Sequence, residues 1–161
     1  MGKINYGRVI LGGIVGGIVG AIIDDFCNGV LAIQLWLDTV KSLNRPNAFI
    51  GAPVAATVGL FLLFIVGAIL MVWLYAAVRP RLGGGVRTAI CIGLVVWTFV
   101  KLLPNTFWIL AGIFGRRIMF YDTLFGIFEF VSAAVIGAAL YKECESTAAY
   151  PAAAEAHQTT R

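Results

Sequence analysis

The stretch that decides the fold class is GGIVGGIVGAIIDDF, residues 12–26. With its flanks it forms an apolar run long enough to cross a membrane as a helix, which needs about 20 apolar residues. Small residues recur every four positions, and two adjacent aspartates arrive before the apolar run has ended. The stretch therefore predicts a membrane-spanning helix with one closely packing face and acidic groups that continue this face.

The composition of the whole chain is that of a polytopic membrane protein. Of its 161 residues, 60% are hydrophobic and 12% are charged, whereas a soluble domain is about 45–50% apolar and about 25% charged. We therefore expect an all-α bundle of four transmembrane helices in residues 1–142, and a polar, flexible cytoplasmic tail in residues 143–161. The predicted spans cover about residues 8–33, 53–78, 88–114 and 118–141.

The first outer loop contains LWLDTVKSLNRPNAFIG, residues 35–51. Trp36 and Val40 are apolar at near-helical spacing, and Asp38 and Lys41 fall on the opposite side. This pattern is typical of a short helix that lies in the membrane interface.

Lysine and arginine are unequally divided between the two sides of the predicted bundle. One side has the termini and the second loop, with Lys3, Arg8, Arg79, Arg81, Arg87, Lys142 and Arg161. The other side has Lys41, Arg45, Arg116 and Arg117. Positive-inside bias predicts that both termini of this multi-pass protein are cytoplasmic. No clustered basic face is present, so we expect no nucleic-acid partner.

The second loop, RPRLGGGVR (residues 79–87), is predicted to be a tight basic turn. Pro80 and the three glycines are expected to break the helix there.

Two tracks of small residues run along the first span and lead to the two aspartates. They are Gly12, Gly16, Gly20 and Asp24, and Gly13, Gly17, Ala21 and Asp25. Small residues at this spacing let two helix backbones approach closely. We expect the glycines to bring a partner helix close and the acids to meet a group on it.

Further charges lie at matching depth in other spans. Lys101 is near the middle of the third span, Glu129 is near the middle of the fourth, and Asp24 lies within reach of Lys101. Asp122, close to the start of the fourth span, is expected to be near the outer interface and in contact with water. A charge at the bilayer centre costs at least about 2.5–3.5 kcal/mol, so the deeper charges should face the bundle interior or a partner subunit.

The sequence thus predicts an intramembrane charge network. Its members are Asp24, Asp25, Asn28, Lys101 and Glu129. One lysine cannot neutralise three carboxylates, so at least one acid should be protonated or hydrated.

Pro104 lies inside the third span, just after Lys101. A proline removes one helix hydrogen bond and clashes with the carbonyl four residues back, here that of Val100. This predicts either a kink that opens a polar cavity or an ordinary, tolerated membrane proline.

No catalytic or metal-binding motif is found. The single histidine, His157, is in the tail, and Cys27, Cys91 and Cys144 form no CxxC pair. A haem or a histidine-rich metal site has no ligands here, and no serine–histidine or HExxH arrangement exists. We therefore expect no metal, no cofactor and no enzymatic activity.

Three segments resemble a family of small, uncharacterised bacterial four-span membrane proteins. They are NYGRVILGGIVGGIV (residues 5–19), DDFCNGVL (24–31) and FGIFEFVSAAVIGAALYKE (125–143). The resemblance implies a location in the bacterial cytoplasmic (inner) membrane. It also implies a recurring acid in the first span and a glutamate in the fourth, which correspond here to Asp25 and Glu129. The chain departs from the family in its second aspartate, Asp24, and in Lys101.

Two functions agree with these features. The first is a non-catalytic accessory or scaffold subunit in the lipid membrane. It would pack through its glycine-rich helix faces and its charge network, either against further copies of itself in a homo-oligomer or against a membrane-protein partner. The alternative is a small oligomeric transporter or channel-like protein, with linkage to protons. Charges that are paired and dry favour the first, and charges that line a cavity favour the second.

Overall fold

The computed structural model describes residues 4–45, 48 and 52–142, and the predicted tail lies outside this range. The described residues confirm an all-α fold with four helical segments of membrane-spanning length. In chain order the elements are α1 (Tyr6–Phe26), the π-helix η1 (Cys27–Leu31), α2 (Ile33–Ser42), α3 (Val54–Leu82), α4 (Val86–Trp97), the π-helix η3 (Thr98–Leu102), α5 (Leu103–Leu110) and α6 (Arg116–Leu140).

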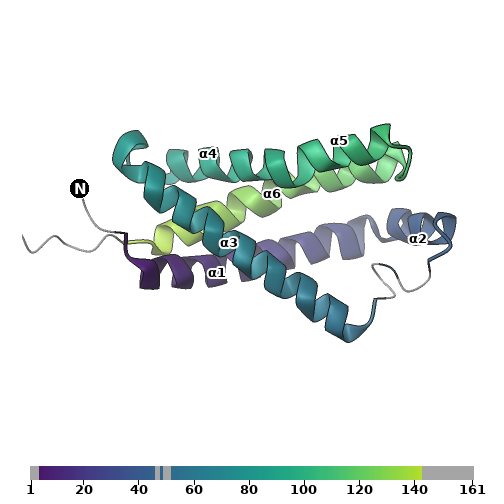
Figure 1. Cartoon of the computed structure of the whole chain (residues 1–161), viewed down its shortest axis with the longest axis horizontal. Coiled ribbons are helices and arrows are strands. Elements are labelled where there is room, and N and C mark those ends of the chain that lie inside the picture. Colours follow the sequence, from purple (N-terminus) through teal and green to yellow (C-terminus); the bar gives the residue numbers. More distant parts are fainter. Residues whose placement is uncertain (1–3, 46–47, 49–51, 143–161) are drawn as a thin grey trace, which may run out of the picture.

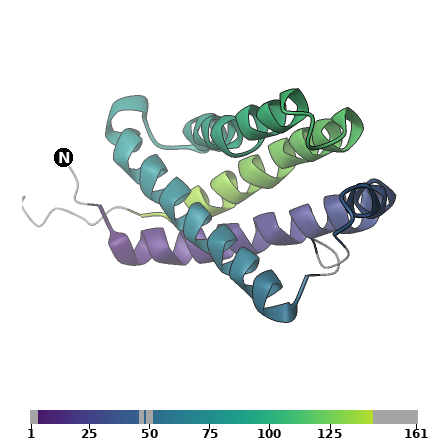
Figure 2. The same ribbon diagram turned by 45° about the vertical axis from the view of Figure 1, so that its right-hand side comes forward.

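The bundle is arranged around α1, which packs against α6 on one side and against α3 on the other, while α4 packs against α6. The start of α1, the end of α6 and the turn between α3 and α4 lie at one end of the bundle (Figure 1). At the opposite end lie α2 and the turn between α5 and α6. Figures 1 and 2 show that α3 crosses α1 and then diverges, so that its N-terminal half stands apart from the bundle.

The ends of the helices follow local chemistry. Asn5 caps α1, because its side-chain oxygen accepts a hydrogen bond from the backbone N–H of Arg8 at 3.2 Å. The prediction that Pro80 breaks the second span is wrong: α3 continues through Pro80 to Leu82. The fixed φ of proline is compatible with a helical backbone, and Pro80 lies in the last turn of α3, where the helix continues without its N–H donor. The helix ends at Gly83, whose φ of 82° is left-handed and favours glycine.

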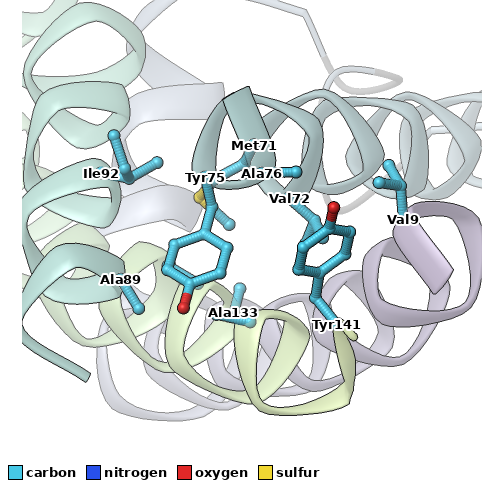
Figure 3. Packing of buried hydrophobic residues seen from close by; sticks show 11 residues of the cluster. Val9, Met71, Val72, Tyr75, Ala76, Ala89, Ile92, Ala133 and Tyr141 are labelled. Atoms are coloured by element: carbon cyan, nitrogen blue, oxygen red, sulfur yellow. The ribbon is translucent and has the colours of Figure 1, made fainter. Parts of the chain in front are cut away.

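The main apolar core lies near the end of the bundle that carries the termini (Figure 3). Val72 of α3 is 1% exposed at its centre. Tyr75 packs edge-to-face on Tyr141 with ring centroids 6.2 Å apart, and its hydroxyl accepts a hydrogen bond from the N–H of Gly85 at 3.0 Å. This contact ties the α3–α4 turn to the core, so that this end of the bundle is firmly packed.

The glycine tracks of α1 face the chain's own helices. A Cβ atom added at Gly12 or Gly16 would lie 2.5 Å from a carbonyl oxygen of α6, that of Gly137 or Ala133 respectively. Gly13 and Gly17 belong to the other track, and added Cβ atoms there would collide with α3. Gly20, further along the first track, lies close to Ala133 of α6 and also to Phe64 of α3. The helices that the glycines bring close are therefore α6 and α3.

The short helix predicted in the first outer loop is present as α2. Trp36 and Val40 are partly buried, whereas Asp38 and Lys41 are exposed. The buried side of α2 joins a second apolar cluster, at the far end of the bundle, whose fully buried members are Ala32, Ile118 and Met119.

Candidate functional site

Six polar side chains from five helical segments meet inside the bundle, between the two apolar clusters. We call this group the polar cluster. It consists of Asp24 of α1, Asn28 of η1, Lys101 of η3, Asn105 of α5, and Asp122 and Glu129 of α6.

Lys101 occupies the centre of the polar cluster. Its Nζ lies 2.9 Å from Oδ1 of Asp122, 3.4 Å from Oδ1 of Asp24 and 3.7 Å from Oε2 of Glu129. One ammonium group therefore faces three carboxylates that come from two different helices.

Two asparagines complete the hydrogen bonding around Asp122. Asn28 Nδ2 donates to Oδ1 of Asp24 at 2.8 Å and to Oδ1 of Asp122 at 3.2 Å. Asn105 Nδ2 donates to the other oxygen of Asp122, Oδ2, at 2.7 Å. Trp36 of α2 donates in turn to Oδ1 of Asn28 at 3.2 Å, which links the outer-loop helix to the polar cluster.

Glu129 differs from the other acids of the cluster. It is only 1% exposed, and neither of its carboxylate oxygens has a hydrogen-bond partner among the described residues. The ammonium group of Lys101, 3.7 Å away, is too distant for a hydrogen bond. A buried carboxylate that accepts no hydrogen bond is costly, so a charge on Glu129 depends on the nearby ammonium group of Lys101 for its compensation.

Both π-helices lie at the polar cluster. Asn28 is in η1, Lys101 is in η3, and Pro104 follows η3 in the first turn of α5. The N–H of Leu103 donates to the carbonyl of Thr98, five residues back. The chain thus forms a turn wider than that of an α-helix just before Pro104, and single π-turns of this kind are frequent at functional sites.

The structure places two acids differently from the sequence prediction. Asp25 is exposed and makes no hydrogen bond or ion pair with any described residue, so in the described structure it lies outside the polar cluster. The reason is that its track faces α3, which has already diverged from α1 at this level. Asp122, expected to be in contact with water, is only 6% exposed.

The role of Asn105 was also not predicted from the sequence. The spacing of Asp122 and of Asn105 nevertheless indicates that both belong to the cluster. Asp122 precedes Glu129 by seven residues, and Asn105 follows Lys101 by four, so each shares a helix face with a predicted member of the network. The position of Asp122 along its span did not predict its burial, because α2 and its apolar contacts cover the bundle close to Asp122.

A cavity of about 1020 Å³ adjoins the polar cluster, between α1, the N-terminal half of α3 and α6. Its acidic lining residues are Asp24, Asp25, Asp122 and Glu129, and most of the others are apolar. The side chain of Asp24 is 29% exposed and presents a carboxylate to this space, whereas Glu129, which also lines it, is only 1% exposed. Cavities of roughly 300–1000 Å³ with a few polar groups are typical of small-molecule sites.

In the described part of the chain, no group of three or more histidine, cysteine, aspartate or glutamate side chains is arranged to hold a metal ion. Comparisons with protein families, curated proteins and solved structures find no match to this chain. The resemblance to small bacterial four-span proteins stays a prediction. The fold and the site define a multi-pass membrane protein with an open-sided, mostly apolar cavity that four acidic residues help to line.

Proposed function

We propose that this protein is a small membrane transporter that exchanges a cation for a proton at the polar cluster. The observation that carries the proposal is a cavity lined by both the partly exposed Asp24 and the buried Glu129, two carboxylates that share one lysine.

Charge balance supports an exchange mechanism. Three carboxylates face one ammonium group, so the fully ionised cluster has two negative charges in excess. In a low-dielectric interior such an excess must be neutralised, either by protons or by a bound cation. A cation that reaches Asp24 therefore competes with protons for the same carboxylates, and binding of one releases the other.

The second candidate is the accessory or scaffold role, with a partner helix in the cavity. It is favoured by the N-terminal half of α3, which stands apart from the bundle and exposes apolar side chains such as Val58 and Leu62. However, Gly12, Gly13 and the other glycines of the two tracks already pack against α6 and α3. The glycines of α1 therefore no longer indicate a partner from outside the chain, and we favour transport.

The experiment measures proton movement across the membrane of liposomes that contain the purified protein and an internal pH-sensitive dye. Inorganic and organic monovalent cations are added outside one at a time, and protein-free liposomes are the control. We expect at least one cation to drive proton movement, and we expect Asp24→Asn and Glu129→Gln to abolish it. Asp38→Asn is the matched control, because Asp38 is exposed on α2 and does not line the cavity.

Proton movement no different from that of protein-free liposomes, for every cation in the panel, would contradict the transport proposal. Purification in mild detergent tests the accessory role separately. A stoichiometric protein partner that is lost in the Asp24→Asn, Glu129→Gln double variant would establish that role.

A further inference from the structure

The walls of the cavity differ in chemistry from its acidic end. Aromatic side chains contribute to them from α1, α2, α3 and α6, namely Phe26, Trp36, Phe61, Phe64 and Phe130. Aliphatic residues of α1 and α3 account for much of the remainder. A small, strongly hydrated ion gains nothing from such walls, whereas a cation with an apolar body would bury that body against them.

The rim of the cavity indicates where such a ligand enters. Ile22 and Phe26 of α1 and Leu60 and Leu63 of α3 line the cavity, and all four are exposed. They lie within membrane-spanning segments, on the two helices that diverge from one another in Figure 2. The rim is thus apolar and opens sideways, towards the hydrocarbon of the bilayer.

One acid lies at this rim. Asp25 lines the cavity, is exposed and pairs with no described residue, while Asp24, one position earlier, faces Lys101. A positively charged group that moves inward from the rim therefore meets Asp25 first and Asp24 next.

We propose that the cavity binds an amphiphilic organic monocation, which has an ammonium or phosphonium group on an aromatic or aliphatic body. The cation enters from the bilayer between α1 and α3, places its apolar body against the aromatic walls, and places its charge at Asp24. This proposal rests on the proposed function, whose cation it assigns to a chemical class.

The test is calorimetric titration of the detergent-purified full-length protein with three probes. Tetraphenylphosphonium has both the charge and the apolar body, tetramethylammonium has the charge with little apolar body, and tetraphenylborate has the body with the opposite charge. We expect saturable binding of tetraphenylphosphonium, at least ten-fold tighter than that of either comparison ion. Asp24→Asn should weaken this binding at least ten-fold, and Asp38→Asn should leave it unchanged.

Equal binding of tetraphenylphosphonium to the wild type and to Asp24→Asn would overturn the proposal, as would equal binding of tetraphenylborate. Size-exclusion profiles of both variants establish that they remain folded. An Asp24→Glu variant, which keeps the charge, should restore binding to within a few-fold of the wild type if the carboxylate is the recognition group.

The lateral entrance is tested by the rate of association. Leu63→Trp adds bulk at the rim and should slow tetraphenylphosphonium association several-fold in stopped-flow fluorescence. Ile18→Trp is the control, because Ile18 is exposed on α1 but does not line the cavity. Equal association rates in the two variants would overturn the lateral entrance.

The failure of this inference can be distinguished from the failure of the proposed function. If tetraphenylphosphonium does not bind but a small inorganic cation drives proton movement in liposomes, the assigned class is wrong and the exchange proposal stands. If no cation of any class drives proton movement, the exchange proposal itself fails.

Discussion

The ammonium group of Lys101 lies 2.9 Å from Oδ1 of Asp122, closer than it lies to Asp24 or to Glu129. Asp122 also receives hydrogen bonds from Asn28 and Asn105, so it is the fully satisfied carboxylate of the polar cluster. The ammonium group of Lys101 lies farther from Asp24 and from Glu129, so its charge stabilises these two carboxylates less. Asp122 is therefore the acid held most firmly by its neighbours, whereas the carboxylate of Asp24 is partly exposed to the cavity.

Replacement of Lys101 by methionine should strongly destabilise the protein. The variant keeps three carboxylates close together without a cation, and removal of one partner of a buried ion pair costs about 3–5 kcal/mol. The measurement is the free energy of unfolding in mixed detergent micelles titrated with a denaturing detergent. Lys41→Met is the control, because Lys41 is exposed on α2. Equal stability of the two variants would show that the ion pairs contribute nothing.

Alanine at Gly16 and alanine at Gly67 should have opposite effects. A Cβ at position 16 would lie 2.5 Å from the carbonyl oxygen of Ala133, so α1 and α6 must separate, at a cost of about 1–3 kcal/mol. Gly67 of α3 has no atom within 4 Å of an added Cβ, and alanine there gains up to about 1 kcal/mol of helix preference. Thermal unfolding of the two variants compares the effects, and a loss of similar size in both would contradict the described packing.

Leucine at position 105 should leave one oxygen of Asp122 without a donor. Asn105 is 7% exposed and donates to Asp122 Oδ2 at 2.7 Å and to Thr123 Oγ1 at 2.9 Å. An unsatisfied buried group costs about 1–3 kcal/mol. Thr106→Val is the control, because Thr106 is exposed and donates only to the carbonyl of Leu102 within its own span. An Asn105→Leu variant that unfolds like Thr106→Val would exclude a structural role for the amide.

The orientation predicted from lysine and arginine can be measured with single cysteines. In a background without native cysteine, Asp38→Cys and Leu82→Cys place one thiol at each end of the bundle, since both positions are exposed. A membrane-impermeant maleimide should label Asp38→Cys in intact cells and Leu82→Cys only after permeabilisation. The reverse pattern would place the termini outside the cytoplasm.

Much of the fold could be predicted from the sequence, because apolar runs of membrane length leave few alternatives. The four spans and α2 followed from run length and from the periodicity around Trp36. The exact ends were less predictable, since Pro80 is compatible with a helix and the conformation of Gly83 ends α3.

The site was only partly predictable. Lys101 and Asp24 lie close together. That Asp24 is in the polar cluster while Asp25 is exposed depends on how α3 crosses α1. The burial of Asp122 depends on the covering by α2 and the adjacent apolar contacts. Crossing angles and coverings of this kind arise from packing between distant segments, which hydropathy and spacing do not encode.

The central position of α1 has a consequence for biogenesis. Because α1 precedes α6 in the chain, the face of α1 with Gly12 and Gly16 stays without its partner helix until α6 is synthesised. Until then, Lys101 has Asp24 as its only acidic partner from the polar cluster, because Asp122 and Glu129 both belong to α6. In a nascent chain that has not reached Arg116, the Lys101–Asp24 pair therefore lacks both the further carboxylates and the cover that α6 provides.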